Sequence, residues 1–252
     1  MKNNDFLIIV PVYQSVNWIT LCIEMIKIQT GDFECIIIDD ASTDGTQQAI
    51  TKAIENDSRF TFYTNKENVG SSLHNFFKVF DMSKVEDEKI VVWMDGDDWF
   101  TSPFVLKHVS SEYDRTGCWM TYGTYQVYPS AKIAHNHCIE CTPEMIENFK
   151  GFRDMPFIFS HLRTHKAFLL RALNRKDLID ERTGNIFTEA TDCAYLLPLV
   201  EMCGNEHFHR IQYPVYMLNR TNPISIGNIR MAKQKETERI IRNKKPYEAL
   251  IR

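Results

Sequence analysis

Long apolar runs are missing from this chain of 252 residues. No uninterrupted apolar stretch approaches the roughly 20 residues that a membrane-spanning helix needs. A signal peptide is also not visible, because the polar segment Met1 to Asp5 is followed by an apolar run, Phe6 to Val10, that is too short for a signal core. We therefore expect a cytoplasmic protein that meets a membrane, if at all, only at its surface.

An excess of positive charge is missing as well, since the formal net charge is −4, and this excludes the usual electrostatic signature of a nucleic-acid-binding protein. Internal repeats and low-complexity segments are absent. With 44% hydrophobic and 25% charged residues the composition is that of an ordinary globular protein. The length suits one large α/β domain with or without a modest extension.

Two kinds of site motif are absent. Neither GxGxxG nor GxxxxGK[ST] occurs, so we expect any bound phosphate to be held through a metal ion and basic side chains. Cys138 and Cys141 have the CxxC spacing, but there is no second such pair, and His135 and His137 nearby do not complete a known ligand spacing. We interpret 129–143 as an ordinary loop, and the seven cysteines as buried free thiols in a reducing compartment.

The first hundred residues alternate between buried strands and amphipathic helices. This order predicts a largely parallel sheet with helices on both faces and a ligand site at the carboxyl ends of its strands. The strands are expected at 6–10, 34–38, 60–63 and 90–94, and the helices between them at 17–29, 46–56 and 72–80.

Acidic residues gather at this predicted edge. Asp95, Asp97 and Asp98 directly follow the strand at 90–94, and like charges so close together call for a neutralising cation, most simply a divalent metal. Asp39 and Asp40 follow the strand at 34–38 in the same way. Each group has a structural alternative, because such acids also cap helices: Asp98 could cap the helix expected at 101–116, and Asp39 or Asp40 a turn into the next helix.

Four motifs together resemble the family 2 glycosyltransferases of GT-A fold. They are Val10-Pro11-Val12-Tyr13, the segment from Ile36 through Asp39-Asp40 to Thr46, Asn68-Val69-Gly70 with Asn75, and Met94-Asp95-Gly96-Asp97-Asp98. The resemblance covers roughly residues 6–125 and is looser beyond. It implies a GT-A (Rossmann-like) sheet, a smaller antiparallel acceptor-side region, a nucleotide diphosphate sugar as donor, most often a UDP-sugar, and Mn²⁺ or Mg²⁺ as cofactor.

The resemblance also implies roles for individual residues. Pro11, Val12 and Tyr13 would border the nucleobase and ribose, and Asp39 or, as the better match, Asp40 would bind the base. Asp97 would hold the metal and through it the diphosphate, while Asp95 would lie near the ribose or the metal. The remaining residues expected in the nucleotide-sugar site are Asn68, Gly70, Asn75, Gly96, Arg163 and Arg220.

In the second half, Asp192 is the predicted catalytic base. It opens an apolar helix at the family's base position, where Thr191 replaces the frequent Glu, so that Glu189 is the second choice. Helix capping by Asp192 is the structural alternative and is compatible with catalysis. The segment 160–170 is expected to be a turn entering a helix, in which His161 and Arg163 either touch the diphosphate or acceptor or orient the helix.

Three further expectations concern the remaining chain. The aromatic segment 119–128 is predicted to be an antiparallel or edge strand, followed much later by closing strands at 207–211 and 214–222. Arg220 matches a family arginine that meets phosphate, but Asn222 stands where the family often has a metal-binding His, which predicts fewer protein ligands for the metal. Residues 1–229 are expected to form one domain with halves 1–116 and 117–229.

The tail from 230 to 252 has eight basic and three acidic residues. We expect it to be helical and interpret it as a solvated helix that packs on the domain through Ile240, Ile241 and Tyr247. A contact with anionic lipid or with another protein, including a second copy, is the alternative.

The predicted activity is transfer of a sugar with inversion to a hydroxyl of a glycan, lipid-linked or protein acceptor. Retaining chemistry is the less favoured alternative. A nucleotidyltransferase should carry a Gly-rich, basic loop after the first strand, which Pro11-Val12-Tyr13-Gln14 is not. A non-catalytic relative that binds sugar nucleotide is the other alternative, supported by Thr191 and Asn222.

Overall fold

The computed structural model describes residues 5–134, 138–224 and 231–252. Its strands and helices follow the predicted alternation through the first hundred residues, with bounds that differ by a few residues from those expected. These elements are β1 (Phe6–Val12), α1 (Ile19–Lys27), β2 (Phe33–Asp39), α2 (Thr46–Ala53), β3 (Phe60–Thr64), α3 (Ser72–Met82) and β4 (Ile90–Trp93).

The remaining elements build the second half of the chain and its tail. They are β5 (Trp99–Phe100), α4 (Val105–Thr116), β6 (Met120–Tyr128), β7 (Lys132–Ile133), α5 (Pro143–Asn148), β8 (Arg163–Lys166), α6 (Ala167–Ala172), the 3₁₀ helix η2 (Arg175–Leu178), β9 (Ile179–Asp180), β10 (Asn185–Ile186), α7 (Thr191–Cys203), β11 (Phe208–Asn219) and α9 (Met231–Arg242).

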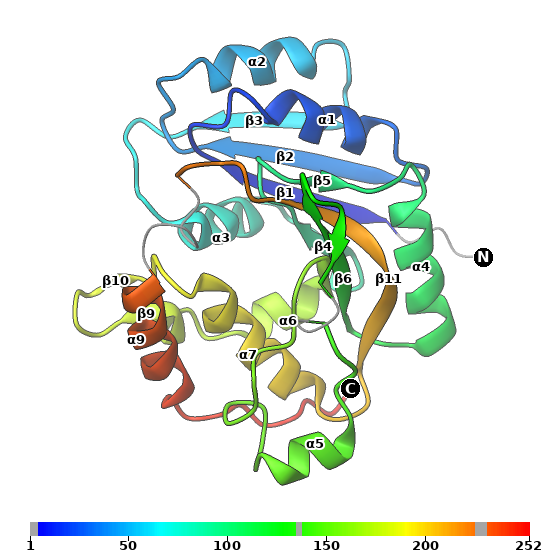
Figure 1. Cartoon of the computed structure of the whole chain (residues 1–252), viewed down its shortest axis with the longest axis vertical. Coiled ribbons are helices and arrows are strands. Elements are labelled where there is room, and N and C mark those ends of the chain that lie inside the picture. Colours follow the sequence, from blue (N-terminus) through cyan, green and yellow to red (C-terminus); the bar gives the residue numbers. More distant parts are fainter. Residues whose placement is uncertain (1–4, 135–137, 225–230) are drawn as a thin grey trace.

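One sheet runs through the described part of the molecule in the order β3-β2-β1-β4-β8-β6-β11-β5, with β7 paired to β6 (Figure 1). β1 pairs in parallel with β2 and β4, and β2 pairs in parallel with β3. β8 is antiparallel to both β4 and β6. Strands β9 and β10 form a separate small antiparallel sheet. The predicted mixed α/β architecture with a largely parallel first half is confirmed.

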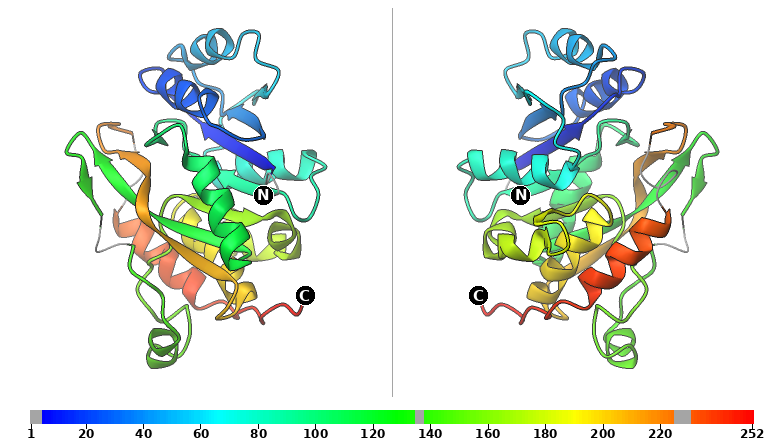
Figure 2. Two further views of the ribbon diagram at one scale, coloured as in Figure 1. Left: turned by 90° about the vertical axis from the view of Figure 1, so that its right-hand side faces the viewer. Right: turned by 90° about the vertical axis from the view of Figure 1, so that its left-hand side faces the viewer.

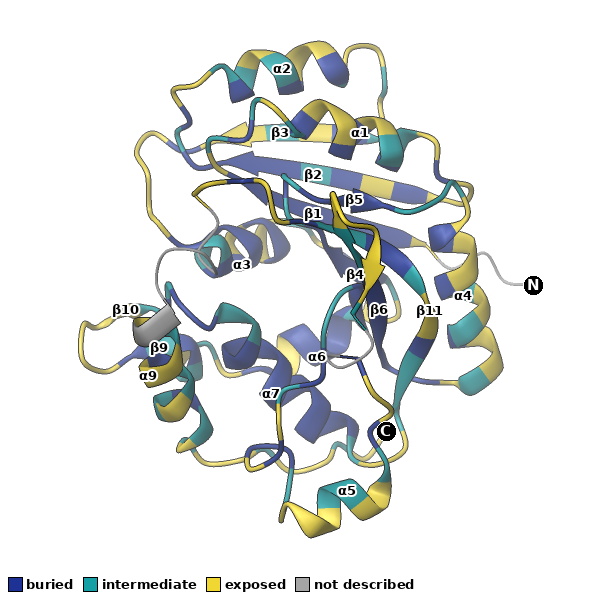
Figure 3. Ribbon diagram, viewed as in Figure 1, coloured by how far each residue is buried: buried dark blue, intermediate teal, exposed yellow. Residues whose placement is uncertain are grey.

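Two hydrophobic cores lie on the two faces of this sheet. Along β1 the side chains alternate: Phe6, Ile8, Val10 and Val12 belong to one core and Leu7 and Ile9 to the other, as the two-residue period of a strand requires. Helices α1 and α2 cover the first face, and α3 lies on the second (Figure 1). β1 is buried at every position, which explains its unbroken apolar sequence (Figure 3).

The structure confirms one prediction for the second half and corrects two others. The segment expected to be an antiparallel or edge strand is β6, which pairs antiparallel with β8 and β7 and parallel with β11, so it is antiparallel on one side but not an edge strand. The turn predicted at 160–170 contains the strand β8. Its sequence, Arg-Thr-His-Lys, is polar and so did not indicate a buried strand. Thr164 fits there because its hydroxyl shares hydrogen bonds with Thr121 (2.6 Å) and Tyr113 (3.0 Å). The two closing strands are one strand, β11, with a register irregularity at Pro214.

Three further expectations concern the cysteines, the loop and tail residues, and membrane-spanning helices. All seven cysteines are free and buried, as predicted. His135 and His137 of the predicted loop lie outside the described residues, as does Arg230 at the start of the tail. No helix in the described ranges is long and apolar enough to cross a membrane.

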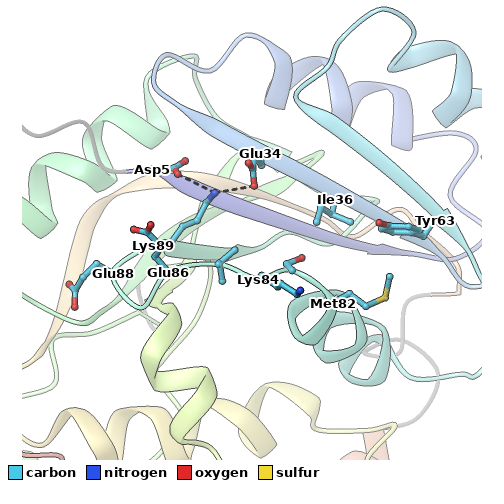
Figure 4. A pocket seen from close by; sticks show the side chains of 11 residues that line it. Asp5, Glu34, Ile36, Tyr63, Met82, Lys84, Glu86, Glu88 and Lys89 are labelled. Carbon is cyan, nitrogen blue, oxygen red and sulfur yellow. Dashed lines mark hydrogen bonds and ion pairs between the residues drawn. The ribbon is translucent and has the colours of Figure 1, made fainter.

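At the amino ends of the strands lies an ion-pair cluster, and none of the predicted motifs is found there. Lys89 Nζ lies 3.1 Å from Asp5 Oδ2 and 3.0 Å from Glu34 Oε2, and so joins the segments that lead into β4 and β1 to strand β2 (Figure 4). A hollow of about 630 Å³ opens beside this cluster. None of the predicted site residues lines it, so the chemistry suggested by the sequence lies elsewhere.

Candidate active site

A cavity of about 700 Å³ lies where β1 and β4 end. Every residue predicted for the nucleotide-sugar site lines it except Asp39, and the cavity also reaches Asp192 and Glu189. Four motifs that are far apart in sequence therefore meet around one space, as expected for the carboxyl edge of such a sheet.

The loop after β1 is fixed to the loop after β2. The backbone N–H of Gln14 donates to Ser42 Oγ (2.8 Å), and the side-chain oxygen of Gln14 accepts from the backbone of Thr43 (3.0 Å) and Asp44 (3.1 Å). Gln14 itself has a positive φ of 48°. These bonds hold Pro11 to Tyr13 at the cavity wall, with Tyr13 42% exposed and so accessible to a ligand.

The two acids after β2 have different surroundings. Asp39 is fully buried and lies outside the cavity lining; its Oδ2 accepts from the Ser42 backbone (2.9 Å) and from Gln47 Nε2 (2.9 Å). Asp40 lines the cavity, and its carboxylate accepts from the backbone N–H groups of Val69 (3.0 Å) and Gly70 (3.0 Å). Asp39 thus organises the turn into α2, whereas Asp40 ties the third motif to the second.

Asn65 links this network to α3, although no motif included it. Its Nδ2 donates to Asp40 Oδ1 (2.8 Å) and to Asn75 Oδ1 (2.8 Å), while its Oδ1 accepts from Lys78 Nζ (2.7 Å). Asn75 is 1% exposed. Its amide therefore has a structural role as well as a place on the cavity wall.

Gly96 allows β1 and the acidic loop to approach closely. A Cβ atom at this position would lie 2.7 Å from both Cβ and Cγ2 of Val12, a separation that real side chains do not adopt. Any larger residue would push the acidic loop away from the end of β1. The glycine between the two acids is thus explained by packing.

Burial raises the pKa of the three acids that follow β4. The pKa of Asp95 is raised to about 6, mainly by burial and further by the neighbouring charge of Asp97. The pKa values of Asp97 and Asp98 are also raised, in both cases chiefly by burial. Trp93 Nε1 donates to Asp95 Oδ1 (2.9 Å), which fixes that carboxylate, and Trp93 is itself stacked on Phe76 with ring centroids 4.4 Å apart.

Asp98 has a structural role that differs from the helix cap expected for it. Its two oxygens accept from Tyr216 Oη (2.6 Å) and from the Asn219 backbone (2.7 Å), and it is followed by β5 rather than by a helix. The expected helix begins only at Val105. Asp98 therefore holds β11 against the acidic loop.

The carboxylate of Asp97 is suited to a divalent cation that takes its remaining ligands from substrate phosphates and water. Asn222 Nδ2 donates to Asp97 Oδ2 (2.7 Å), and Asn222 Oδ1 accepts from the Ile224 backbone (3.2 Å), which sets the orientation of the amide. No cluster of three or more His, Cys, Asp or Glu that could hold a metal occurs in the described part of the chain. One or two carboxylates with phosphate oxygens and water are nevertheless a common donor set for Mg²⁺.

The side of the cavity next to α7 contains a buried arginine between a histidine and the predicted base. Asp192 lies in the first turn of α7, and Arg163 Nη2 donates to its Oδ2 (3.2 Å). The same nitrogen lies 3.3 Å from His161 Nε2. Because arginine can only donate, that histidine nitrogen must accept, and burial together with the charges of Arg163 and Arg220 lowers the pKa of His161 well below its usual value.

Glu189 is paired with a residue from the tail helix that the sequence did not single out. Its side chain is 4% exposed and accepts from Thr188 Oγ1 (2.7 Å), and Lys233 Nζ lies 2.8 Å from its Oε1. Gln234, the next residue of α9, lines the cavity. Both residues lie in a segment whose charge pattern indicates only a basic helix, so nothing in the local sequence pointed to the site.

Comparison with known proteins agrees with this geometry. The family model described as "Glycosyl transferase family 2" matches residues 7–178, which is more than half of the chain. The chain is a family 2 glycosyltransferase. Asp192, Arg220 and α9 lie beyond the matched residues.

Curated relatives of this glycosyltransferase match over a short segment. An uncharacterized glycosyltransferase of Rickettsia felis is 34% identical over 94 residues, which cover 37% of this chain and 15% of the relative. Glycosyltransferase GlyA of Streptococcus pneumoniae serotype 4 is 31% identical over 106 residues, or 42% and 14% of the two chains. The matched segment thus spans about one seventh of these relatives.

Solved structures share the fold over most of this chain. Residues 1–349 of S. aureus TarS in complex with UDP-GlcNAc give a TM-score of 0.68 at 18% identity, covering 94% of this chain and 65% of that one. The mannosyltransferase PcManGT from Pyrobaculum calidifontis, in complex with GDP-Man and Mn²⁺, gives 0.61 at 20% identity, covering 96% and 65%. The predicted GT-A fold is confirmed.

Proposed function

We propose that the protein transfers a sugar with inversion from a UDP-sugar to a hydroxyl group, assisted by a divalent cation. The observation that carries the proposal is the single cavity that unites Asp40, Asp95 and Asp97 with Asp192 and Arg163. The carboxylates of Asp95 and Asp97 at one end of the cavity match the needs of a leaving diphosphate with its cation, and the carboxylate of Asp192 at the other end matches those of an attacking hydroxyl.

The donor would occupy the side formed by the ends of β1 and β4. Tyr13 and Pro11 border the base and ribose in this proposal, Asp40 and the amides that it holds near Asn68 and Gly70 complete that wall, and Arg220 meets the phosphates. TarS and a mycobacterial glucosyl-3-phosphoglycerate synthase of the same fold are solved with UDP or UDP-sugars, which supports uridine as the base.

Asp97 and Asp95 would hold Mn²⁺ or Mg²⁺. When bound, such a cation stabilises the negative charge that develops on the leaving diphosphate. Asn222 Nδ2 donates to one oxygen of Asp97, which sets the orientation of the carboxylate at the cavity. Structures of the mannosyltransferase and of the synthase with Mn²⁺ support this choice of ion.

Asp192 would act as the base on the acceptor side. The acceptor oxygen forms a bond to the anomeric carbon, the bond from that carbon to the diphosphate oxygen breaks, and the proton of the acceptor hydroxyl passes to Asp192. Arg163 holds the carboxylate in place through the 3.2 Å hydrogen bond. His161, kept neutral by its surroundings, adds no further positive charge beside Arg163.

The alternative is a relative that binds sugar nucleotide without catalysis, which the substitution of Asn222 for a metal-binding His favours. Measuring UDP release from a panel of UDP-sugars, with and without Mn²⁺, separates the two. We expect Mn²⁺-dependent release that falls at least 100-fold in Asp192→Asn with UDP affinity retained. UDP binding without any release from the parent protein would favour the non-catalytic relative, and absence of UDP binding would contradict both.

A further inference from the structure

Helix α9 forms part of the wall of the active-site cavity. Gln234 lines the same cavity as Asp97 and Asp192, and α9 lies alongside α7, whose first turn holds Asp192 (Figures 1 and 2). The family match ends at residue 178, well before this helix, and so assigns no role to α9.

The contact between α9 and the site is electrostatic. A buried carboxylate is costly unless a cation or hydrogen-bond donors compensate its lost hydration. Lys233 supplies the cation for Glu189 at 2.8 Å, and Thr188 supplies a hydroxyl donor. Because Glu189 stands three residues before Asp192, Lys233 fixes the segment that leads directly to the proposed base.

The middle and the carboxyl end of α9 are tied to the body of the protein. Arg182 reaches Glu236 (3.0 Å) and Thr237 (3.2 Å) halfway along the helix. At the carboxyl end, Arg153 Nη1 donates to the carbonyl of Ile241 (2.7 Å), and Arg242 Nη1 donates to the carbonyl of Arg153 (2.7 Å). Ile241 is 2% exposed. The helix is therefore a fixed wall.

Four basic residues of the tail have partners within the protein. Lys233 pairs with Glu189, Arg242 with Glu238 and Arg252 with Asp87 and Glu88, and Lys244 Nζ donates to the carbonyl of Ile179 (3.2 Å). The basic side chains in these contacts are therefore less available to bind anionic lipid or an acidic protein. These contacts favour the packing interpretation of the tail over the lipid-binding one.

The chemistry of this wall indicates what kind of acceptor it would contact. Of the described residues of α9, only Gln234 lines the cavity, whereas Lys233, which pairs with Glu189, lies outside the lining, so this helix presents an amide rather than a cation to the cavity. Gln234 offers one carbonyl acceptor and two N–H donors, which suit hydroxyl groups. We propose that α9 forms the acceptor-binding side of the cavity, where Gln234 contacts an uncharged, hydroxyl-rich acceptor and Lys233 positions the Glu189 segment.

This inference rests on the proposed function, and the experiment keeps the two apart. UDP affinity is measured by calorimetry with Mn²⁺, and UDP release from UDP-sugars is measured with octyl glycosides of glucose, galactose and N-acetylglucosamine as uncharged probes and glycerol 3-phosphate as the anionic probe. The variants are Gln234→Ala, Lys233→Met and Lys233→Arg. Lys235→Met is the matched control, because Lys235 is an exposed lysine on the same helix outside the cavity lining.

We expect an octyl glycoside to accelerate UDP release and Gln234→Ala to raise its KM at least fivefold, with a smaller change in kcat and less than a twofold change in the dissociation constant of UDP. Lys233→Met should raise the same KM, Lys233→Arg should restore it, and Lys235→Met should match the parent.

Any other result contradicts either the proposed function or a specific part of the inference about α9. If the parent does not bind UDP, the proposed function fails and the inference falls with it. If UDP binds but the glycoside KM of Gln234→Ala equals that of Lys235→Met, α9 is not the acceptor wall and the inference alone is wrong. If only glycerol 3-phosphate accelerates UDP release, or if the parent releases UDP from a UDP-sugar but no glycoside accelerates the release, the uncharged acceptor class is wrong. If UDP binds but is released under no condition, the proposed catalytic function fails and the inference falls with it.

Discussion

The acids on the two sides of the cavity differ in what balances their charge. On the acceptor side, Asp192 is paired with Arg163 and Glu189 with Lys233. On the donor side, Asp95, Asp97 and Asp98 form no ion pair with a basic side chain among residues 5–134, 138–224 and 231–252, and their pKa values are raised. One side is compensated by the fold itself, whereas the other is held in an electrostatically unfavourable arrangement.

In our proposal this difference corresponds to different roles for the two groups of acids. Buried acids without a basic partner favour a ligand that brings positive charge, so the donor side is ready for a cation and its diphosphate. Acids that are already paired keep their geometry before any ligand arrives, which suits a base that must meet an acceptor in a defined orientation. Three of the following changes test one side of this comparison, and the last tests the core beneath it.

The largest effect is expected at Asp97. Asp97→Ala should reduce Mn²⁺-dependent turnover of UDP-sugar on the order of 1000-fold, because it removes a carboxylate that would anchor the cation at the leaving group. Steady-state UDP release with a titration of Mn²⁺ measures the loss. If turnover stays within threefold of the parent at every Mn²⁺ concentration, the proposed metal-binding role of Asp97 is refuted.

Asp192→Asn should have the next largest effect. The amide keeps the size of the side chain and a hydrogen-bond acceptor for Arg163 but cannot take a proton, so kcat should fall about 100-fold or more. UDP affinity and the melting temperature serve as controls and should change little. A fall in the melting temperature with kcat intact would instead make Asp192 only a helix-capping residue.

Gly96→Ala tests the packing that supports the donor side. The added Cβ would lie 2.7 Å from Val12, so we expect a loss of about 2–3 kcal/mol in the free energy of unfolding, the usual cost of overpacking. Urea unfolding measures this loss, and a weaker affinity for UDP should accompany it. Gly117→Ala, at a glycine with open space around it, controls for the general effect of the substitution.

That control is not free of strain, because Gly117 has a φ of 66° and alanine there also costs stability. The informative difference is in ligand binding: Gly117→Ala should leave the dissociation constant of UDP unchanged. Equal weakening of UDP binding by both variants would contradict the role assigned to the contact between Gly96 and Val12.

The smallest effect is expected at His165, in the core of the second half. Burial lowers the pKa of His165 to about 3 from 6.5, so between these pH values the unfolded chain binds a proton that the folded protein does not. Stability is therefore lost as the pH falls below 6.5. Relative to His165→Leu, the parent should lose about 2 kcal/mol between pH 7 and pH 5, measured by urea unfolding at both values. Parallel pH profiles of the two proteins would contradict this.

The first half of the chain could be predicted well because its strands and its motif residues are determined by short, contiguous sequence patterns. Apolar strands such as Ile90–Trp93 are buried inside the sheet, and the motif residues follow directly after them, so the position of a strand also determines the position of its acids. Asp40 and Asp97 could be assigned to the cavity on this basis, whereas the different orientation of Asp39 depends on Ser42 and Gln47 and could not.

The second half depends on contacts between distant segments. The strand β8 has a polar sequence but lies between β4 and β6, where Thr164 is hydrogen-bonded to residues of neighbouring elements. The pairing of Lys233 with Glu189 joins residues 44 positions apart, which no local periodicity records. Predictions made from single elements therefore missed both the buried polar strand and the wall formed by the tail.

The most direct test of the account is a calorimetric titration of UDP into the protein with and without Mn²⁺. We expect saturable binding of one UDP that is at least tenfold tighter with Mn²⁺ and that loses this dependence in Asp97→Ala. Absence of any binding heat for UDP in the presence of Mn²⁺, in a protein that is folded by circular dichroism, would contradict the claim that this cavity is a donor site.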